Sequence, residues 1–187
     1  MEISRAGMTD LDGVMDLHRR YHISSISPGD KPDGFVTTNF TPEQLHALVE
    51  KERGITVAKD DGRIIAYAMA ASWQFWSEWP LFAYMIEKLG ENSYNGLSLS
   101  VENSYQYGPI CVDRQYRGSG VFQKVFYASL DSMAGRYPVM VTFINRINHR
   151  SYAAHTKKVT MDTVCTFKFN QNDYYMLACP VKSKTQA

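Results

Sequence analysis

The sequence predicts a single α/β or α+β domain in which helices cover both faces of a central sheet. The 187 residues are enough for one domain with a substantial core and too few for two domains of ordinary size. A hydrophobic fraction of 44% and a charged fraction of 21% are those of a globular protein. The elements follow one another as helix, helix, hairpin, strand, helix, strand, helix and hairpin, without an internal repeat or linker. The domain is therefore expected to span residues 1–187.

The N-terminal part of the chain predicts two helices and one hairpin. Thr41-Pro42-Glu43-Gln44 indicates a helix start, because Thr favours the N-cap, Pro the first helical position and Gln the third. Thr9 and Asp12 have the spacing of a capping box, and Asp61-Gly62 favours a tight turn. The expected ranges are a helix over 10–21, a loop over 22–40, a helix from 41 that ends at Gly54, and strands over 55–58 and 64–71.

The C-terminal part adds an aromatic insert and further strands and helices. Gly108-Pro109 lies within an apolar strand, and because proline cannot donate to a β-ladder, this strand is expected to bulge or splay. Residues of about 73–100 form the aromatic-rich insert, which either packs an extra helix on the sheet or walls an acceptor pocket. The expected ranges are a helix over 81–89, a connection over 92–99, a strand over 105–112, a helix over 119–134, a strand over 139–143, a helix over 149–158, and strands over 164–169 and 174–179.

Charge and cysteine content narrow the class of protein. A formal net charge of +1 gives no reason to expect nucleic acid or an anionic membrane as a partner. The three cysteines lie far apart without a CxxC pair, so neither a disulfide framework nor a metal site is expected. There is no secretory signal pattern and no apolar run long enough to span a bilayer. We therefore expect a cytoplasmic protein.

The segment Gln115-Tyr116-Arg117-Gly118-Ser119-Gly120 follows an apolar strand and opens a helix. Its glycines let backbone N–H groups converge on a ligand without an intervening Cβ. The helix adds unpaired N–H groups and the positive end of its dipole. Arg117 and Arg114 are expected to bring charges that suit phosphate oxygens. No Gly-Lys-Ser/Thr is present, which excludes a P-loop, and a dinucleotide fingerprint would need a third glycine. The segment predicts an anion site.

Two motifs lie in order, about one βα unit apart. The first is Gln115-x-x-Gly118-x-Gly120, and the second is Asn148-x-x-Ser151-x-x-x-His155. Together they resemble the GNAT superfamily of acyl-CoA-dependent N-acyltransferases. The order of elements is similar from the first helix to the final hairpin, so the resemblance covers nearly the whole chain. It implies acetyl-CoA as cofactor and a mixed, mostly antiparallel central sheet with a splayed strand.

The resemblance implies a role for each residue of the motifs. Backbone N–H groups would bind the CoA pyrophosphate, mainly those of Gln115, Tyr116, Arg117, Gly118, Ser119, Gly120 and Val121. Ile110 and Val112 would offer backbone groups to the pantetheine arm, which lies beside the splayed strand like a further strand. Asn148 and Ser151 would line the other side of that arm, and a helix cap is the alternative role of Asn148.

His155 stands where the family usually has the tyrosine that protonates the departing CoA thiolate. Imidazolium is a good donor, but with a reference pKa of about 6.5 it is the minority form at neutral pH. His155 can therefore act as the catalytic acid only if its pKa is raised, and the alternatives are protonation by solvent or by Tyr152. A partly buried histidine with ordinary hydrogen bonds is the other interpretation. No general base is assigned among Glu102, Glu78 and Tyr107.

The predicted function is an N-acetyltransferase that moves an acetyl group directly from acetyl-CoA to a primary amine of a small-molecule or peptide acceptor. A non-catalytic module that binds or senses acyl-CoA is the alternative, because the expected tyrosine and an evident base are both missing. A pure interaction protein would require the glycine loop to be structural only. By analogy with the family, a homodimer is also expected.

Overall fold

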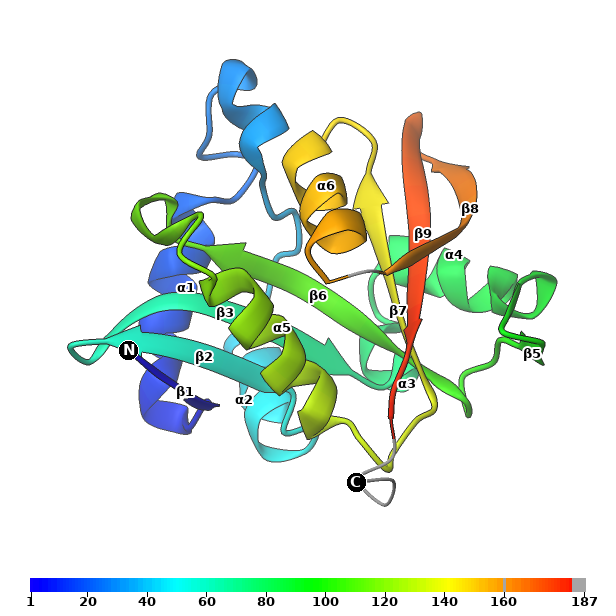
Figure 1. The fold of residues 1–187 in the computed structure, drawn as a ribbon, viewed down its shortest axis with the longest axis horizontal. Helices are drawn as coiled ribbons and strands as arrows, with labels where there is room; N and C mark the ends of the chain where they lie inside the picture. The colour runs from blue at the N-terminus through cyan, green and yellow to red at the C-terminus, as the bar shows by residue number, and fades with distance from the viewer. Residues whose placement is uncertain (160, 183–187) are drawn as a thin grey trace. The chain divides into compact units, whose positions relative to one another are not determined.

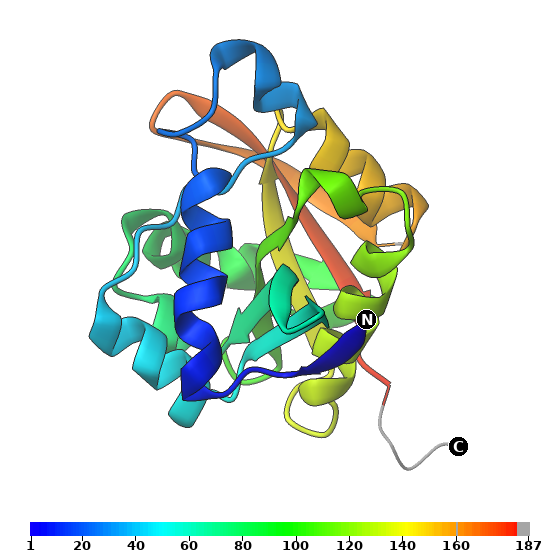
Figure 2. The same cartoon turned by 90° about the vertical axis from the view of Figure 1, so that its left-hand side faces the viewer.

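The computed structural model describes residues 1–159 and 161–182 (Figures 1 and 2). Its contacts divide the chain into two compact units. Unit 1 consists of Met1–Ala70 with Gly108–Ser132, and unit 2 consists of Ala71–Tyr107 with Met133–Ala187. The single domain over 1–187 stays a prediction, and its residues 160 and 183–187 lie outside the described part of the chain.

Unit 1 is a set of antiparallel strands with helices on both faces. β1 (Glu2–Arg5) pairs with β2 (Ile55–Asp60), and β2 pairs with β3 (Arg63–Ala71). Residues 64–70 are all buried, which requires cover on both faces of the sheet. α5 (Val121–Ser132) covers one face, and α1 (Leu11–Arg20) with α2 (Pro42–Glu50) covers the other (Figures 1 and 2). The shorter elements of the unit are η1 (Met8–Asp10), η2 (Pro28–Asp33) and η4 (Arg114–Tyr116).

The predicted helix start at Thr41 is confirmed, whereas the capping box predicted at Thr9 is not formed. At α2 the Gln44 N–H donates to Thr41 Oγ1 (3.2 Å) and the Thr41 N–H donates to Gln44 Oε1 (2.9 Å), as predicted. The prediction at Thr9 is wrong. A 3₁₀ turn precedes α1, and the carboxylate that accepts the reciprocal bond is that of Asp10, from the N–H of Gly7 (3.0 Å). The capping residues therefore start two positions earlier than the sequence spacing indicated.

Unit 2 begins with the aromatic insert. The insert folds as α3 (Trp73–Trp76), α4 (Pro80–Lys88), η3 (Leu89–Glu91), and a two-stranded ribbon of β4 (Ser93–Tyr94) and β5 (Leu97–Ser98). Trp73 and Trp76 are fully buried, and Trp76 stacks on Phe82 with 4.7 Å between ring centroids. Phe82 packs edge-on against Phe143 of β7 (Val139–Asn145), with 5.1 Å between ring centroids. These rings pack the insert against the C-terminal strands.

Seven strands of the described residues form one mixed, mostly antiparallel sheet in the order β1-β2-β3-β6-β7-β9-β8. In unit 2, β9 (Asn172–Pro180) pairs antiparallel with β7 (Val139–Asn145) and β8 (Asp162–Phe169). β6 (Ser104–Val112) is parallel to β7, but their register covers three pairs and ends at Gln106↔Val141. Beyond it the Thr142 hydroxyl donates to the Tyr107 carbonyl (2.7 Å), in place of a ladder bond. The predicted mixed sheet and splayed strand are confirmed.

Several short elements were missed by the sequence patterns, among them β1, η2, α3 and the ribbon of β4 and β5. β1 has only four residues, too few for a visible alternation, and η2 lies inside the predicted loop 22–40. The remaining helix, α6 (His149–Lys157), agrees with the predicted range to within one residue. Among the helices of the described residues, none has the length and apolarity that crossing a membrane requires.

Candidate cofactor site

The predicted anion loop connects β6 to α5 in unit 1. Gly118 (φ 89°) and Gly120 (φ 84°) both adopt positive φ, which a residue with a Cβ reaches only with strain. Apart from chain neighbours, no atom lies within 4 Å of the place that a Cβ on either glycine would occupy. The backbone conformation, and not crowding, therefore requires glycine here. The same open space lets a ligand approach the backbone before α5 begins at Val121.

Asp113 holds the start of this loop, although neither sequence motif includes it. Its side chain is 4% exposed, and its Oδ2 accepts from both Arg20 Nη1 (3.0 Å) and Arg63 Nη2 (2.6 Å). Its Oδ1 accepts from the Gln115 N–H (3.3 Å), so Asp113 caps the η4 turn. Burial alone would raise the pKa of Asp113, but the bonds from Gln115 and Arg20 and the nearby positive charges outweigh it and lower the pKa. An Asp directly before a turn was the available signal.

The arginine of the motif is held by the protein itself. Arg117 Nε donates to the Val112 carbonyl (3.2 Å), and Nη1 donates to the Asp33 carbonyl (3.0 Å). The Arg117 guanidinium also lies over the ring of Tyr21, 5.0 Å from its centroid. Arg117 therefore fixes the loop to the segment that contains η2, which leaves the backbone N–H groups as the main donors for an anion.

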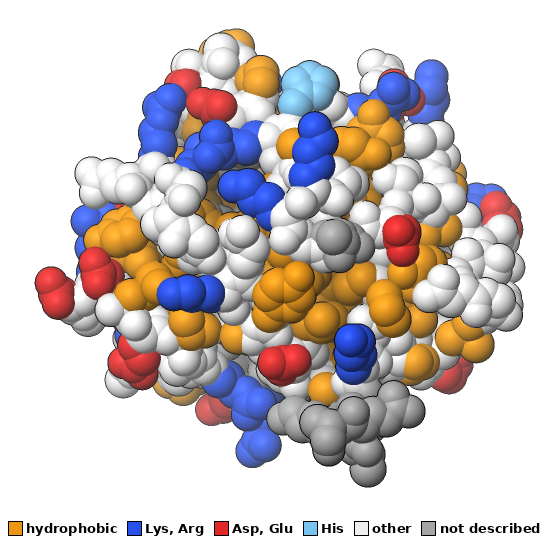
Figure 3. Space-filling model, viewed as in Figure 1, with side chains coloured by type: hydrophobic (Ala, Val, Ile, Leu, Met, Phe, Trp, Pro, Cys, Tyr) orange, Lys and Arg blue, Asp and Glu red, His pale blue; other side chains and the backbone are white. Residues whose placement is uncertain are grey.

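Arg114 remains accessible beside this loop. It is 66% exposed and lies 3.4 Å from Asp33 Oδ2 and 3.9 Å from Asp30 Oδ1. Such exposed ion pairs are weak and exchange readily for another anion. Figure 3 shows Lys and Arg side chains gathered at the upper left of the view. In the same view, Figure 1 draws the loop before α5 and the segment around η2 there.

The second motif lies on α6 in unit 2. Asn148 is the N-cap of this helix, because its Oδ1 accepts from the Ser151 N–H (3.2 Å). The alternative cap role of Asn148 is thereby confirmed. Ser151 Oγ lies 3.4 Å from His155 Nδ1, so the three motif residues share one face of the helix, as their spacing predicted.

His155 is neutral at physiological pH. It is 2% exposed, and its Nδ1–H donates to the Ser151 carbonyl (2.7 Å). Burial lowers the pKa of His155 to about 4, against the smaller opposite effect of the Ser151 bond. An acid that works near pH 7 would need the opposite shift. The other candidate donor, Tyr152, shares a hydrogen bond with Thr163 (3.0 Å).

The residues that the sequence left open as bases differ in their surroundings. Glu78 and Glu102 are exposed. Tyr107 is fully buried, and burial raises its pKa well above the usual value, so its hydroxyl stays protonated. The hydrogen bond with Ser100 lowers the pKa of Glu102, whereas a base that works near pH 7 requires a raised pKa.

A second buried histidine, His18, was not indicated by any sequence pattern. His18 of α1 accepts from the Tyr67 hydroxyl at Nδ1 (2.6 Å) and donates from Nε2 to the Thr38 carbonyl (2.7 Å). Burial lowers the pKa of His18 to about 4. This neutral histidine ties the segment 22–40 to the helix and to β3, so it positions that segment without carrying charge.

Comparison with known proteins places this fold. No model of a known protein family matches the sequence, and no curated protein sequence matches it. Among solved structures, an N-acetyltransferase from Staphylococcus aureus Mu50 has a TM-score of 0.63 at 18% identity, over 97% of this chain and 98% of that one. An aminoglycoside 6'-N-acetyltransferase complexed with coenzyme A has a TM-score of 0.64 at 11% identity, over 98% and 99%. A putative acetyltransferase from Salmonella typhimurium with its cofactor acetyl-CoA has a TM-score of 0.61 at 16% identity, over 100% and 96%.

The chain has the fold of the GNAT superfamily, as the two motifs predicted. The match extends over nearly the full length of each chain. At these identities the likeness concerns the fold, and the activity must be argued from the site.

Proposed function

We propose that the chain transfers an acetyl group from acetyl-CoA directly to a primary amine of a small-molecule or peptide acceptor. The observation that carries the proposal is the pair of positive-φ glycines, Gly118 and Gly120, at the open N-terminus of α5 and after a strand whose parallel pairing ends early. Backbone N–H groups at a helix N-terminus suit a pyrophosphate. Two of the similar structures contain coenzyme A or acetyl-CoA, which supports the same cofactor here.

The cofactor contacts follow from this placement. The N–H groups of Gln115, Tyr116, Arg117 and Ser119 already donate inside the loop. Those of Gly118, Gly120 and Val121 would therefore be the main donors to the pyrophosphate, while Arg117 keeps the loop in shape. Ile110 and Val112 lie in the part of β6 beyond its register with β7, where their backbone groups would pair with the pantetheine arm. Asn148 and Ser151, at the start of α6, would contact the same arm. Acetyl-CoA would supply the activated acyl group.

The chemistry requires little of the protein beyond positioning. A neutral amine would attack the thioester carbon and form the C–N bond, the C–S bond would break as the thiolate leaves, and the amine nitrogen would lose one proton to solvent. A backbone N–H near Val112 would polarise the thioester carbonyl. Holding the amine in line replaces a bimolecular encounter by an effectively unimolecular step. Because His155 is neutral with a low pKa, solvent is the source that we propose for the thiolate proton.

The second candidate is an acyl-CoA binding module without turnover. The neutral, buried His155 favours it, since neither this residue nor the buried, protonated Tyr107 provides an acid or base suited to pH 7. This module would bind acetyl-CoA tightly and release no CoA with any amine. A buried acid is not essential when the leaving group is a stable thiolate, and for that reason we place transfer first.

The test is CoA release from acetyl-CoA with amino acids, polyamines, aminoglycosides and peptide N-termini as acceptors. Gly120→Trp is the control, because its side chain would fill the space over the loop. Transfer predicts release with at least one amine and none from the control. Binding of CoA without release would select the binding module, and failure to bind CoA would exclude both. His155→Gln should keep its turnover within about threefold, whereas a loss of about hundredfold would make His155 the proton donor.

A further inference from the structure

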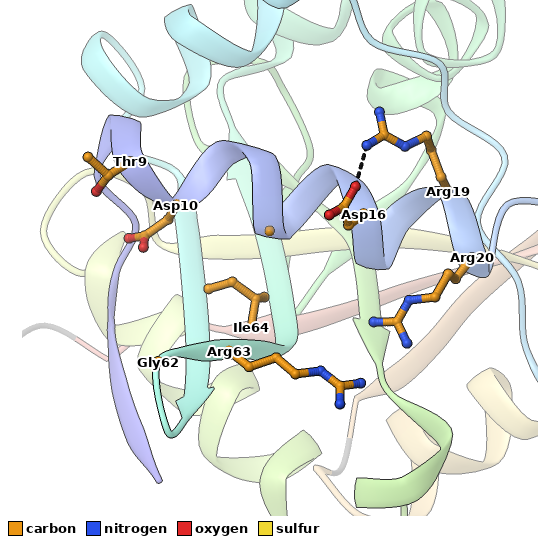
Figure 4. A pocket seen from close by; sticks show the side chains of 9 residues that line it. Thr9, Asp10, Asp16, Arg19, Arg20, Gly62, Arg63 and Ile64 are labelled. Atoms are coloured by element: carbon orange, nitrogen blue, oxygen red, sulfur yellow. Dashed lines mark hydrogen bonds and ion pairs between the residues drawn. The ribbon is translucent and has the colours of Figure 1, made fainter.

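A charged cavity of about 690 Å³ lies in unit 1, and its lining includes no residue of the glycine loop 115–120. It is bordered by α1 and by the turn that joins β2 to β3 (Figure 4). Gly13 allows α1 to lie this close to β3, because a Cβ at that position would lie 2.7 Å from Ile64 Cγ1. The charged residues of its lining are Asp10, Asp16, Arg19, Arg20 and Arg63. The proposed transfer reaction uses none of them.

The two carboxylates of the lining are already neutralised. Asp10 Oδ1 accepts from Lys59 Nζ at 2.7 Å. Asp16 forms an ion pair with Arg19, one turn further along α1, which Figure 4 draws as a dashed line. These pairs cancel within the cavity wall, so neither carboxylate leaves a net negative charge to repel an anion.

Arg20 and Arg63 leave an excess of positive charge. Both guanidinium groups donate to the same atom, Oδ2 of the buried Asp113, so two positive charges share one negative charge. Each group makes one hydrogen bond within the described residues, although a guanidinium has five N–H donors. The side chains are 46% and 53% exposed, and Figure 4 shows their guanidinium groups side by side below α1.

We propose that Arg20 and Arg63 form a binding site for a phosphate group, either free phosphate or a phosphate monoester. The two planar guanidinium groups have further N–H donors. They therefore suit a tetrahedral, doubly charged phosphate better than they suit a single carboxylate ligand. The buried Asp113 fixes both guanidinium groups in advance, as outer carboxylates do in many anion and metal sites, which lowers the entropy cost of binding. The cavity is much larger than one phosphate, so it has room for the small molecule that carries the group.

The experiment is titration of the whole chain with inorganic phosphate, with glucose 6-phosphate and with glucose. Binding is followed by calorimetry and by the ¹⁵N–¹H resonances of the arginine side chains. We expect both phosphate compounds to bind, glucose not to bind, and the Arg20 and Arg63 resonances to shift. Tighter binding of glucose 6-phosphate would identify a phosphorylated metabolite as the ligand, and equal affinity would identify free phosphate.

Three variants make the test specific. Arg20→Met and Arg63→Met should each weaken phosphate binding at least about tenfold, since each removes a charge-assisted contact. Arg19→Met is the matched control, because Arg19 lines the same cavity but pairs with Asp16, and it should bind within about twofold of the unmodified chain. Either Met variant leaves Asp113 with only one of its two arginine partners, which could affect folding. Arg63→Lys is therefore a second variant that keeps the positive charge beside Asp113 but lacks the planar guanidinium group.

The proposal is overturned if phosphate fails to bind in the millimolar range, or if Arg19→Met weakens binding as much as Arg63→Met does. It is also overturned if folded Arg63→Lys and both Met variants bind like the unmodified chain. Saturation with CoA should leave phosphate binding unchanged. Loss of phosphate binding under CoA would mean that the arginines serve the cofactor and form no separate site. Each of these outcomes is independent of whether acetyl transfer occurs.

Discussion

Asp113→Asn tests how the cofactor loop is held. The substitution keeps the size and one acceptor oxygen but removes the charge that Arg20 and Arg63 share. It therefore leaves two guanidinium groups without their counter-ion and weakens the cap on the η4 turn at the Gln115 N–H. A role confined to stability and a role in shaping the loop make different predictions for CoA affinity.

The expected magnitude follows from the contacts. Hydrogen bonds to a charged partner contribute about 1.5–3 kcal/mol, whereas exposed ion pairs contribute less than about 1 kcal/mol. Asp113 is buried, but both arginines are about half exposed, so we expect a loss of about 2 kcal/mol in the free energy of unfolding. For a chain of this size that corresponds to a decrease of about 4–8 °C in Tm. Because the turn precedes the N–H groups that hold the pyrophosphate, the Kd for CoA should rise about tenfold.

Thermal unfolding by circular dichroism and CoA calorimetry measure the two effects separately. Thr41→Ala provides the control, since it removes a capping box at α2, remote in sequence from the loop. If Asp113→Asn lowers Tm but leaves the Kd for CoA unchanged, Asp113 is a stability residue and the positioning role is wrong. An unchanged Tm would show that the shared carboxylate contributes less than its contacts indicate.

Three further predictions concern named residues. Thr41→Ala should lower the free energy of unfolding by about 1 kcal/mol without changing the Kd for CoA, as measured by urea unfolding and calorimetry. Gly118→Ala should destabilise the chain by about 1 kcal/mol through its positive φ, and it should weaken CoA binding, which calorimetry would detect. His18 and His155 have folded pKa values of about 4, below their value of 6.5 in the unfolded chain. The unfolded chain therefore takes up protons first, and stability present above pH 6.5 is lost as the pH falls toward 4, by about 3 kcal/mol for each histidine. Urea unfolding as a function of pH should show this loss, and His155→Gln should reduce its slope; an unaltered slope would contradict the low pKa.

Local signals in the sequence predicted much of the fold. The capping box at Thr41, the interruption at Gly108-Pro109 and the glycines of the loop each depend on one short stretch of chain, and the structure contains all three features. The order of strands depends on contacts distant in sequence and was not predicted, and the family resemblance implied only a mixed, mostly antiparallel sheet with a splayed strand. β1 was missed because four residues show too little alternation to be recognised.

The site was harder to predict because its charges are partnered over long sequence separations. Arg117 looks like a phosphate ligand in sequence, yet its guanidinium is engaged by Asp33 and Val112. Asp113 looks like an ordinary turn residue, yet it joins arginines from α1 and β3. The pKa of His155 depends on its burial, which no local pattern reveals.

The central claim is that the loop of residues 115–121 binds the pyrophosphate of coenzyme A through backbone N–H groups, chiefly those of Gly118, Gly120 and Val121. It is tested most directly by backbone ¹⁵N–¹H spectra during titration with CoA and, separately, with pantetheine, which lacks the pyrophosphate. The amide resonances of Gly118, Ser119, Gly120 and Val121 are predicted to shift with CoA and to stay in place with pantetheine. CoA binding that leaves these amides unshifted would contradict the account.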